Sequence, residues 1–248
     1  MQFSFDEYDL AAKTWEENEA RIADADFVAL PTGSTEQHSR HLPTFVDSLR
    51  ATELTRELAA AAPEHGLDIA VLPTLPYGES EHHMHFAGTV TLDPSTYQDV
   101  IVDIGRSVAR HGADRFLILN THGGNRRPLS LAADRLERDV DIVTHFVHWT
   151  NYGRDRLVEE FGDDWGHAGE HETSTIELFY PELVRTDRKE PQDTTESPET
   201  RRFSYFEELT EQGGLGDPTA SDPEFVESVI EATTEDILSA LAADVDGD

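Results

Sequence analysis

The amino-acid sequence predicts an α/β fold built on a mainly parallel sheet. Short apolar runs alternate along the chain with stretches of helical periodicity, which is the repetition of βα units. Histidines and carboxylates gather directly after two of these runs, and open α/β sheets place their sites at the carboxyl ends of strands. The length of 248 residues suits one domain with a substantial core. We therefore expect a single domain over residues 1–248.

The apolar runs mark the expected strands. The first predicts a buried strand that ends at Pro31 and Gly33, because both residues interrupt regular structure. The run at 115–120 is the most apolar and is typical of a central parallel strand. In chain order, the expected strands are 27–30, 69–72, 116–119 and 142–147.

Amphipathic stretches between and after these runs predict helices near 47–62, 95–111, 126–138 and 172–180. A last helix is expected over about 223–243, where apolar residues recur from Phe225 to Leu241. Residues 186–222 are rich in Thr, Asp, Glu and Pro. We expect them to form an excursion or a subunit-contact loop and not a separate domain.

A first group of candidate metal ligands follows the first strand. Glu36 and His38 are two residues apart, so in an extended chain their side chains fall on the same side. Asp47 can return across the turn to join them. One short segment can thus supply three ligands of a catalytic metal site. Isolated Glu-x-His pairs are also common in solvated loops, so this interpretation depends on the other groups.

A second group follows the run at 115–120. His122 would stand at the tip of the strand, and the glycines after it let the backbone approach a ligand and open the helix that begins near Asn125. A tight strand-to-helix turn is the alternative interpretation. Such a turn needs the glycines but not the histidine.

A third group lies at 167–174, directly before and within a predicted helix. Glu172 is explained as a first-turn residue that the helix dipole favours. That explanation does not account for His167, Glu170 and His171 on the same approach to the helix. A fourth group, with histidines at 82, 83 and 85, is equally well explained as a polar loop or as ligands.

Together these segments resemble the creatininase family, the creatinine amidohydrolases. The resemblance rests on three motifs in order along the chain: Gly-Ser-x-Glu-x-His-x-x-His-Leu-Pro from Gly33, Asn-x-His-Gly-Gly-Asn from Asn120, and His-Ala-Gly-x-x-Glu-Thr-Ser from His167. It implies a three-layer α/β/α sandwich with a mainly parallel sheet, two divalent metal ions per subunit, hydrolysis of a carbon–nitrogen amide bond, and a homo-hexamer.

The resemblance also implies a role for individual residues. Glu36 and His122 would hold one metal, His38 would help to hold the other, and Asp47 would bridge both. His167 matches the histidine that shuttles protons in the family.

One departure from the family pattern affects the second metal. Creatininase itself has a further glutamate ligand two residues after the histidine of the third strand, and this chain has Gly124 there. The second metal would then keep only His38 and a share of Asp47, whereas catalytic zinc usually keeps three protein ligands. We predict that Glu170, and not Glu172, supplies the missing carboxylate. His171 is a weaker rival.

The residue types indicate the chemistry. The chain has no cysteine, so nitrogen and oxygen ligands would hold Zn²⁺, Mn²⁺ or Fe²⁺. A metal-bound hydroxide would attack the amide carbonyl, and His167 would protonate the departing nitrogen. A cyclic or small amide like creatinine is the first substrate hypothesis. The second is a formylamino-pyrimidine nucleotide, with Arg126 and Arg127 as possible phosphate anchors. The third is a metal-binding family member that has lost catalysis.

The charge balance restricts the partners and the environment. Lysine and arginine total 19 against 51 aspartates and glutamates, a net charge of −32. Such a chain repels itself unless salt screens the charge, which suggests the cytoplasm of a halophile. Nucleic-acid binding is disfavoured because phosphates would be repelled. The sequence contains neither an apolar stretch of membrane-spanning length nor a signal-like start, so we expect a soluble cytoplasmic protein without a membrane partner.

Overall fold

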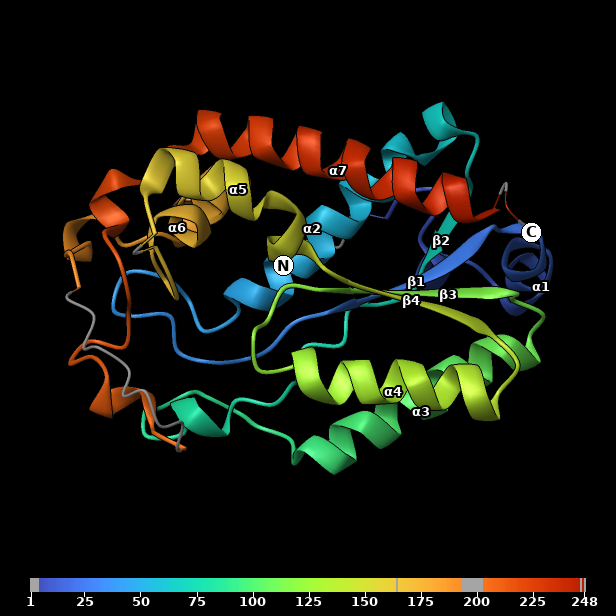
Figure 1. The fold of residues 1–248 in the computed structure, drawn as a ribbon, viewed down its shortest axis with the longest axis horizontal. Coiled ribbons are helices and arrows are strands. Elements are labelled where there is room, and N and C mark those ends of the chain that lie inside the picture. The colour runs from blue at the N-terminus through green and yellow to red at the C-terminus, as the bar shows by residue number, and fades with distance from the viewer. Residues whose placement is uncertain (1–4, 164, 193–202, 246, 248) are drawn as a thin grey trace.

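The computed structural model describes residues 5–163, 165–192, 203–245 and 247, and its centre is a parallel sheet. In the described residues this sheet has four strands in the order β2-β1-β3-β4. They are β1 (Phe27–Thr32), β2 (Ile69–Val71), β3 (Arg115–Asn120) and β4 (Val143–His148). Helices flank the sheet on both sides (Figure 1), so the predicted α/β fold is confirmed.

The helices form two layers. On one face lie α3 (Pro94–Arg110) and α4 (Arg126–Asp139). The other face is covered by α2 (Val46–Ala61), α5 (Trp149–Phe161), α6 (Glu170–Phe179) and α7 (Pro223–Val245). A short helix, α1 (Trp15–Asp24), precedes β1. None of the described helices is long and apolar enough to cross a bilayer.

Alternate residues of each central strand serve the two layers. Phe27 and Ala29 of β1 belong to the core shared with α2, α5 and α7, whereas Val28 and Leu30 belong to the core shared with α3 and α4. Side chains alternate between the faces of a sheet, so a strand covered on both sides must be apolar at every position. This explains the uninterrupted apolar runs in the sequence.

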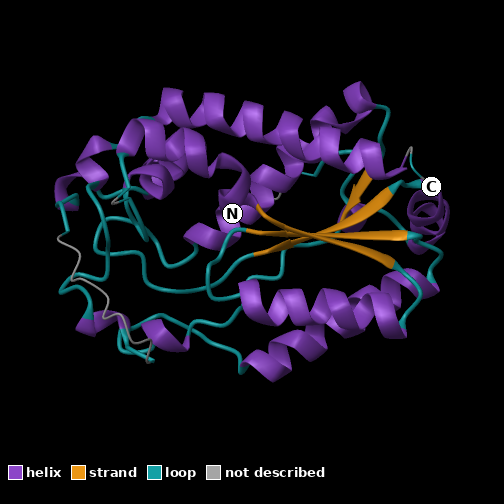
Figure 2. Cartoon of the chain, viewed as in Figure 1, coloured by secondary structure: helices purple, strands orange, loops and turns teal. Residues whose placement is uncertain are grey.

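The register of β1 and β3 fixes where the site can form. The two strands pair in parallel, with Thr32 opposite Asn120, so both end at the same edge of the sheet. The loops that leave this edge gather beside it (Figure 2). Gly33 permits the first turn of α2 to come close, because a Cβ there would lie 2.5 Å from the backbone nitrogen of Ser48.

Some elements differ from expectation. β1 continues through Pro31, whose carbonyl accepts from the backbone N–H of Leu75 at 2.9 Å, so the proline does not end the strand. Helices α1 and α5 were not expected: α1 buries only Ile22 of its residues, and α5 contains Gly153, a residue type that is unfavourable within a helix. Of the expected excursion at 186–222, residues 193–202 lie outside the described part of the chain.

Candidate metal centre

Five carboxylate and imidazole side chains meet at the carboxyl ends of β1 and β3. Glu36 and His38 lie on the loop after β1, and Asp47 lies in the first turn of α2. The backbone N–H of Glu36 donates to the carbonyl of Thr44, which closes this loop and brings Asp47 back to it. His122 follows β3 directly, and Glu172 lies in the first turn of α6. All five are buried.

The five side chains form two groups that share Asp47. In the first group, His122 Nδ1 lies 3.3 Å from Glu36 Oε1 and 3.0 Å from Asp47 Oδ2. In the second group, His38 Nε2 lies 3.5 Å from Asp47 Oδ1 and 3.6 Å from Glu172 Oε2. Each oxygen of the Asp47 carboxylate thus faces a different group. This is the arrangement that a carboxylate bridging two cations requires.

Backbone carbonyls orient both histidines. His122 Nε2 donates to the carbonyl of Glu79 at 2.7 Å, and His38 Nδ1 donates to the carbonyl of Glu36 at 3.1 Å. A carbonyl can only accept, so the remaining nitrogen of each neutral ring carries a lone pair. Those nitrogens, His122 Nδ1 and His38 Nε2, face the carboxylates. Metal-ligating histidines are held by outer hydrogen bonds of this kind.

Three polar atoms at the centre are buried without a hydrogen-bond partner among the described residues. They are Glu36 Oε1, His38 Nε2 and Asp47 Oδ2. Orphaned buried polar atoms are rare because each one loses its hydration without compensation. Divalent cations would satisfy all three, and the nitrogen and oxygen donors suit Zn²⁺, Mn²⁺ or Fe²⁺. The residues present therefore fit a metal centre.

The charges in the metal-free protein agree with this view. Burial alone would lower the pKa of His38, but the carboxylates of Asp47, Glu172 and Glu36 raise it to about 9. Burial would likewise lower the pKa of His122, yet Glu36 and Asp47 hold it well above its ordinary value. Both rings thus keep a second proton where the carboxylates meet. Cations that bind there must displace these protons.

Glu170, which we predicted as the fifth ligand, does not join the two groups. Its Oε1 accepts from the backbone N–H of Asp217 at 2.6 Å. Glu172 lies beside His38 instead. An α-helix turns about 100° per residue, so side chains two positions apart point to nearly opposite sides. In the first turn of α6, Glu172 faces the strand tips and Glu170 faces the chain near residue 217.

The reason for that prediction also changes. A Cβ at Gly124 would lie 2.5 Å from His122 Nε2 and 2.1 Å from the carbonyl oxygen of Glu79. Position 124 thus adjoins the first group and not the group that contains His38. The glycine at position 124 is therefore no reason to expect a further ligand beside His38.

His167 stands at the edge of both groups. Its Nε2 donates to the carbonyl of Gln37 at 2.7 Å, which leaves Nδ1 as the nitrogen with the lone pair. Nδ1 lies 3.6 Å from Glu36 Oε1, and the ring centroid is 4.3 Å from that of His38. Burial lowers the pKa of His167, so the ring is neutral at neutral pH and can accept a proton.

The comparisons with known proteins agree with this geometry. The family model described as "Creatininase: Creatinine amidohydrolase" matches residues 11–241. The chain belongs to the creatininase family. A creatinine amidohydrolase from Pseudomonas putida is 32% identical over 194 residues, which cover 71% of this chain and 73% of the relative. A mycofactocin precursor peptide peptidase from Mycobacterium tuberculosis is 31% identical over 227 residues, which cover 87% and 84%.

A solved structure of this family, described as "Creatininase Mn", has a TM-score of 0.84 at 27% identity and covers 96% of this chain and 99% of its own. The family assignment makes this chain an amidohydrolase. The relatives act on different substrates, a small molecule and a precursor peptide, so membership alone does not fix the substrate.

Several residues of this creatininase-family site were not predicted. Gln37 donates through Nε2 to His83 Nδ1 and to the carbonyl of Gly213, each at 2.8 Å. His83 Nε2, which then carries the proton of that ring, lies 3.4 Å from Glu36 Oε1. The ring of Phe206 packs 4.3 Å from that of His83. The histidines at 82, 83 and 85 were a sequence signal for His83, whereas nothing local in the sequence marked Phe206.

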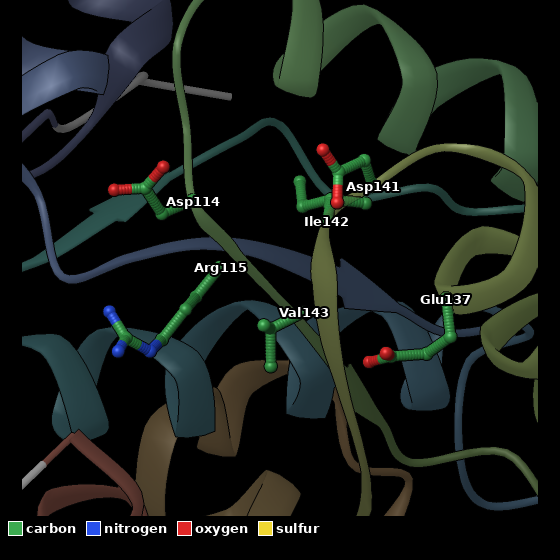
Figure 3. A pocket seen from close by; sticks show the side chains of 6 residues that line it. All are labelled: Asp114, Arg115, Glu137, Asp141, Ile142 and Val143. Atoms are coloured by element: carbon green, nitrogen blue, oxygen red, sulfur yellow. The ribbon is translucent and has the colours of Figure 1, made fainter. Parts of the chain in front are cut away.

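A surface cavity elsewhere in the protein is unrelated to this site. It opens where β3 and β4 begin, at the opposite edge of the sheet (Figure 3). The lining residues are Asp114, Arg115, Glu137, Asp141, Ile142 and Val143. None of the candidate metal ligands lines it.

Proposed function

We propose that this amidohydrolase cleaves its amide at a centre of two divalent metals. Glu36, His122 and Asp47 Oδ2 would hold the first cation, and His38, Glu172 and Asp47 Oδ1 would hold the second. The division of the two Asp47 oxygens between the groups is the observation that carries the proposal. Divalent cations supply Lewis acidity there, which polarises a carbonyl and lowers the pKa of water.

Glu172 takes the place that we first gave to Glu170. Its Oε2 lies 3.6 Å from His38 Nε2, and Arg50 Nη1 holds its other oxygen at 2.6 Å. The backbone N–H of Ala168 donates to Oε2 at 2.7 Å. These contacts fix the carboxylate beside His38. With Glu172 included, each cation would have three protein ligands, the number usual in catalytic zinc sites.

His167 is the proton carrier in this proposal. Its Nδ1 accepts the proton of the attacking water as the new carbon–oxygen bond forms. The same atom then donates that proton to the leaving nitrogen as the carbon–nitrogen bond breaks. The carbonyl of Gln37 holds the ring throughout, because it fixes the other proton on Nε2. The surrounding rings of His83 and Phe206 help to keep bulk water away.

A small cyclic amide of the creatinine type is the first substrate in this proposal. The P. putida relative is a creatinine amidohydrolase, and a solved structure that matches with a TM-score of 0.84 is a creatininase. A peptide amide is the second candidate, because the mycobacterial peptidases match a larger share of the chain. The formylamino-pyrimidine nucleotide has less support, since Arg126 and Arg127 are exposed and belong to the surface of α4.

The cellular setting is proposed on the sequence alone. The net charge of −32 supports a high-salt cytoplasm, and the family resemblance supports a homo-hexamer. Size-exclusion chromatography and thermal unfolding, each at low and at molar KCl, test both points. A monomer at every salt concentration would contradict the oligomer, and unfolding that is insensitive to salt would contradict the halophilic setting.

A product assay tests the activity directly. The purified protein, loaded in turn with Zn²⁺, Mn²⁺ or Fe²⁺, is given creatinine, a short peptide panel or the formylamino-pyrimidine nucleotide. Creatine, cleaved peptide or formate is then measured, with the His167→Ala variant as the control. Creatine formation that the variant lacks supports the first candidate. Cleaved peptide alone favours the second, and no product from any amide would contradict the proposed catalysis.

A further inference from the structure

The first cation of the proposed centre would have three protein ligands, and position 124 cannot supply a fourth. A Cβ at Gly124 would lie 2.1 Å from the carbonyl oxygen of Glu79 and 3.1 Å from Glu79 Oε2. That separation from a backbone oxygen is too short for any side chain, because the backbone would have to shift. A further ligand must come from another element of the fold.

The short 3-10 helix η3 (Glu81–His83) carries a histidine to this place. The ligand atoms of Glu36, His82 and His122 all lie within 4.8 Å of one another. The rings of His82 and His122 are nearly parallel, with 12° between their planes and 6.1 Å between their centroids. The three side chains are therefore close enough together to share one cation.

The neighbouring histidines of the segment have other partners. His83 Nδ1 receives a hydrogen bond from Gln37. His85 Nδ1 lies 2.5 Å from Glu207 Oε1 at an exposed position. For His82 we find no hydrogen bond or ion pair within the described ranges, although its ring is partly buried and packs beside His83 at 4.2 Å. Of these three rings, His82 is the one available to a ligand.

We infer that His82 is a further protein ligand of the cation held by Glu36 and His122. This inference rests on the proposed two-metal centre. Imidazole is a good ligand for zinc and for iron, and a fourth protein donor would complete a tetrahedral set around the first cation. The second cation would keep three protein donors and an open position. The two cations would therefore differ in affinity, with the first bound more tightly than it would be without His82.

Metal affinity tests the inference without any substrate. The variant is His82→Ala, and His85→Ala is the matched control because it removes an imidazole from the same segment. Each protein is loaded with Zn²⁺ alone, and competition with a chromophoric chelator gives the affinity of each site. Second-sphere substitutions already weaken metal binding about 10- to 100-fold, so loss of a direct ligand should weaken one site at least about 10-fold. His85→Ala should behave like the wild type.

X-ray absorption of the zinc-loaded proteins provides a second measurement. The average number of imidazoles per zinc should fall in His82→Ala and stay unchanged in His85→Ala. If His82→Ala does not fold, His82→Gln serves in both experiments. Unchanged affinities together with an unchanged imidazole count would overturn the inference. A wild-type protein that binds fewer than two zinc ions would overturn the two-metal proposal instead, and the difference in imidazole count would still decide the role of His82.

Discussion

Replacing Glu172 by glutamine should remove the second metal, whereas the same change at Glu170 should not. Glutamine keeps the volume but not the charge, so the second cation would retain only His38 and a share of Asp47. The affinity of that site should fall at least about 10-fold. Glu170 lies outside both groups, and a glutamine oxygen in its place can still accept from the backbone N–H of Asp217.

The Glu172→Gln variant should also be less stable without metal. Glu172 Oε1 lies 2.6 Å from Nη1 of the buried Arg50, and removing one partner of a buried pair costs about 3 to 5 kcal/mol. The pKa of the Glu172 carboxylate leads to a similar free energy. Burial raises its pKa, but Arg50 and His38 lower it to about 2, a depression worth about 3 kcal/mol at any pH above 4.5. In a chain of this size the melting temperature should drop by roughly 6 to 20 °C.

Two assays on the Glu172→Gln and Glu170→Gln proteins measure these effects. Zinc content after dialysis, followed by chelator competition, reports the second site. Calorimetry of the metal-free proteins reports stability. The assignment is refuted if Glu172→Gln keeps two zinc ions at wild-type affinity while Glu170→Gln loses one.

Three further predictions concern the rest of the centre. Asp47→Ala should lose both cations, whereas Glu36→Ala and His38→Ala should each lose one; equal losses in all three variants, measured by elemental analysis, would argue against a bridge. His167→Ala should keep both cations but lower turnover about 10²- to 10⁴-fold, and a variant with full activity would exclude the proton-carrier role. The pKa of His38 is about 9 in the folded metal-free protein against 6.5 in the unfolded chain, because Asp47 and Glu172 outweigh burial. The protonation of His38 should therefore stabilise the folded state by up to about 3 kcal/mol. This stabilisation should be complete below pH 6.5 and disappear as the pH rises through 9. A metal-free protein whose free energy of unfolding is the same at pH 7 and pH 10 would contradict this prediction.

The sequence predicted the central strands of the sheet because β1 and β3 are almost wholly buried. The apolar runs of β1 and β3 agree with the strands in the structure, and the expected helices correspond to α2, α3, α4, α6 and α7. Helix α1 escaped prediction although a capping box marks its start, in which the side chain of Thr14 accepts from the backbone N–H of Glu17; the helix buries only Ile22 of its residues. Local sequence also does not encode the strand order, which depends on pairing between distant segments.

The candidate site shows the same limit. Glu36, His38 and His122 were expected to lie together because they follow strands whose ends the parallel sheet brings together, and the structure does place them side by side with Asp47. The choice between Glu170 and Glu172 depended on the direction in which the first turn of α6 faces, which tertiary packing decides. The ion pair between Arg50 and Glu172 joins residues 122 positions apart, so no local pattern reveals it.

Anomalous diffraction from a crystal of the zinc-loaded protein tests the two-metal centre most directly. We predict two peaks per chain, one between Glu36 and His122 and one between His38 and Glu172, with one Asp47 oxygen directed at each peak. A single peak, or two peaks of which one has no contact with Asp47, would contradict the bridged centre on which the proposed hydrolysis depends.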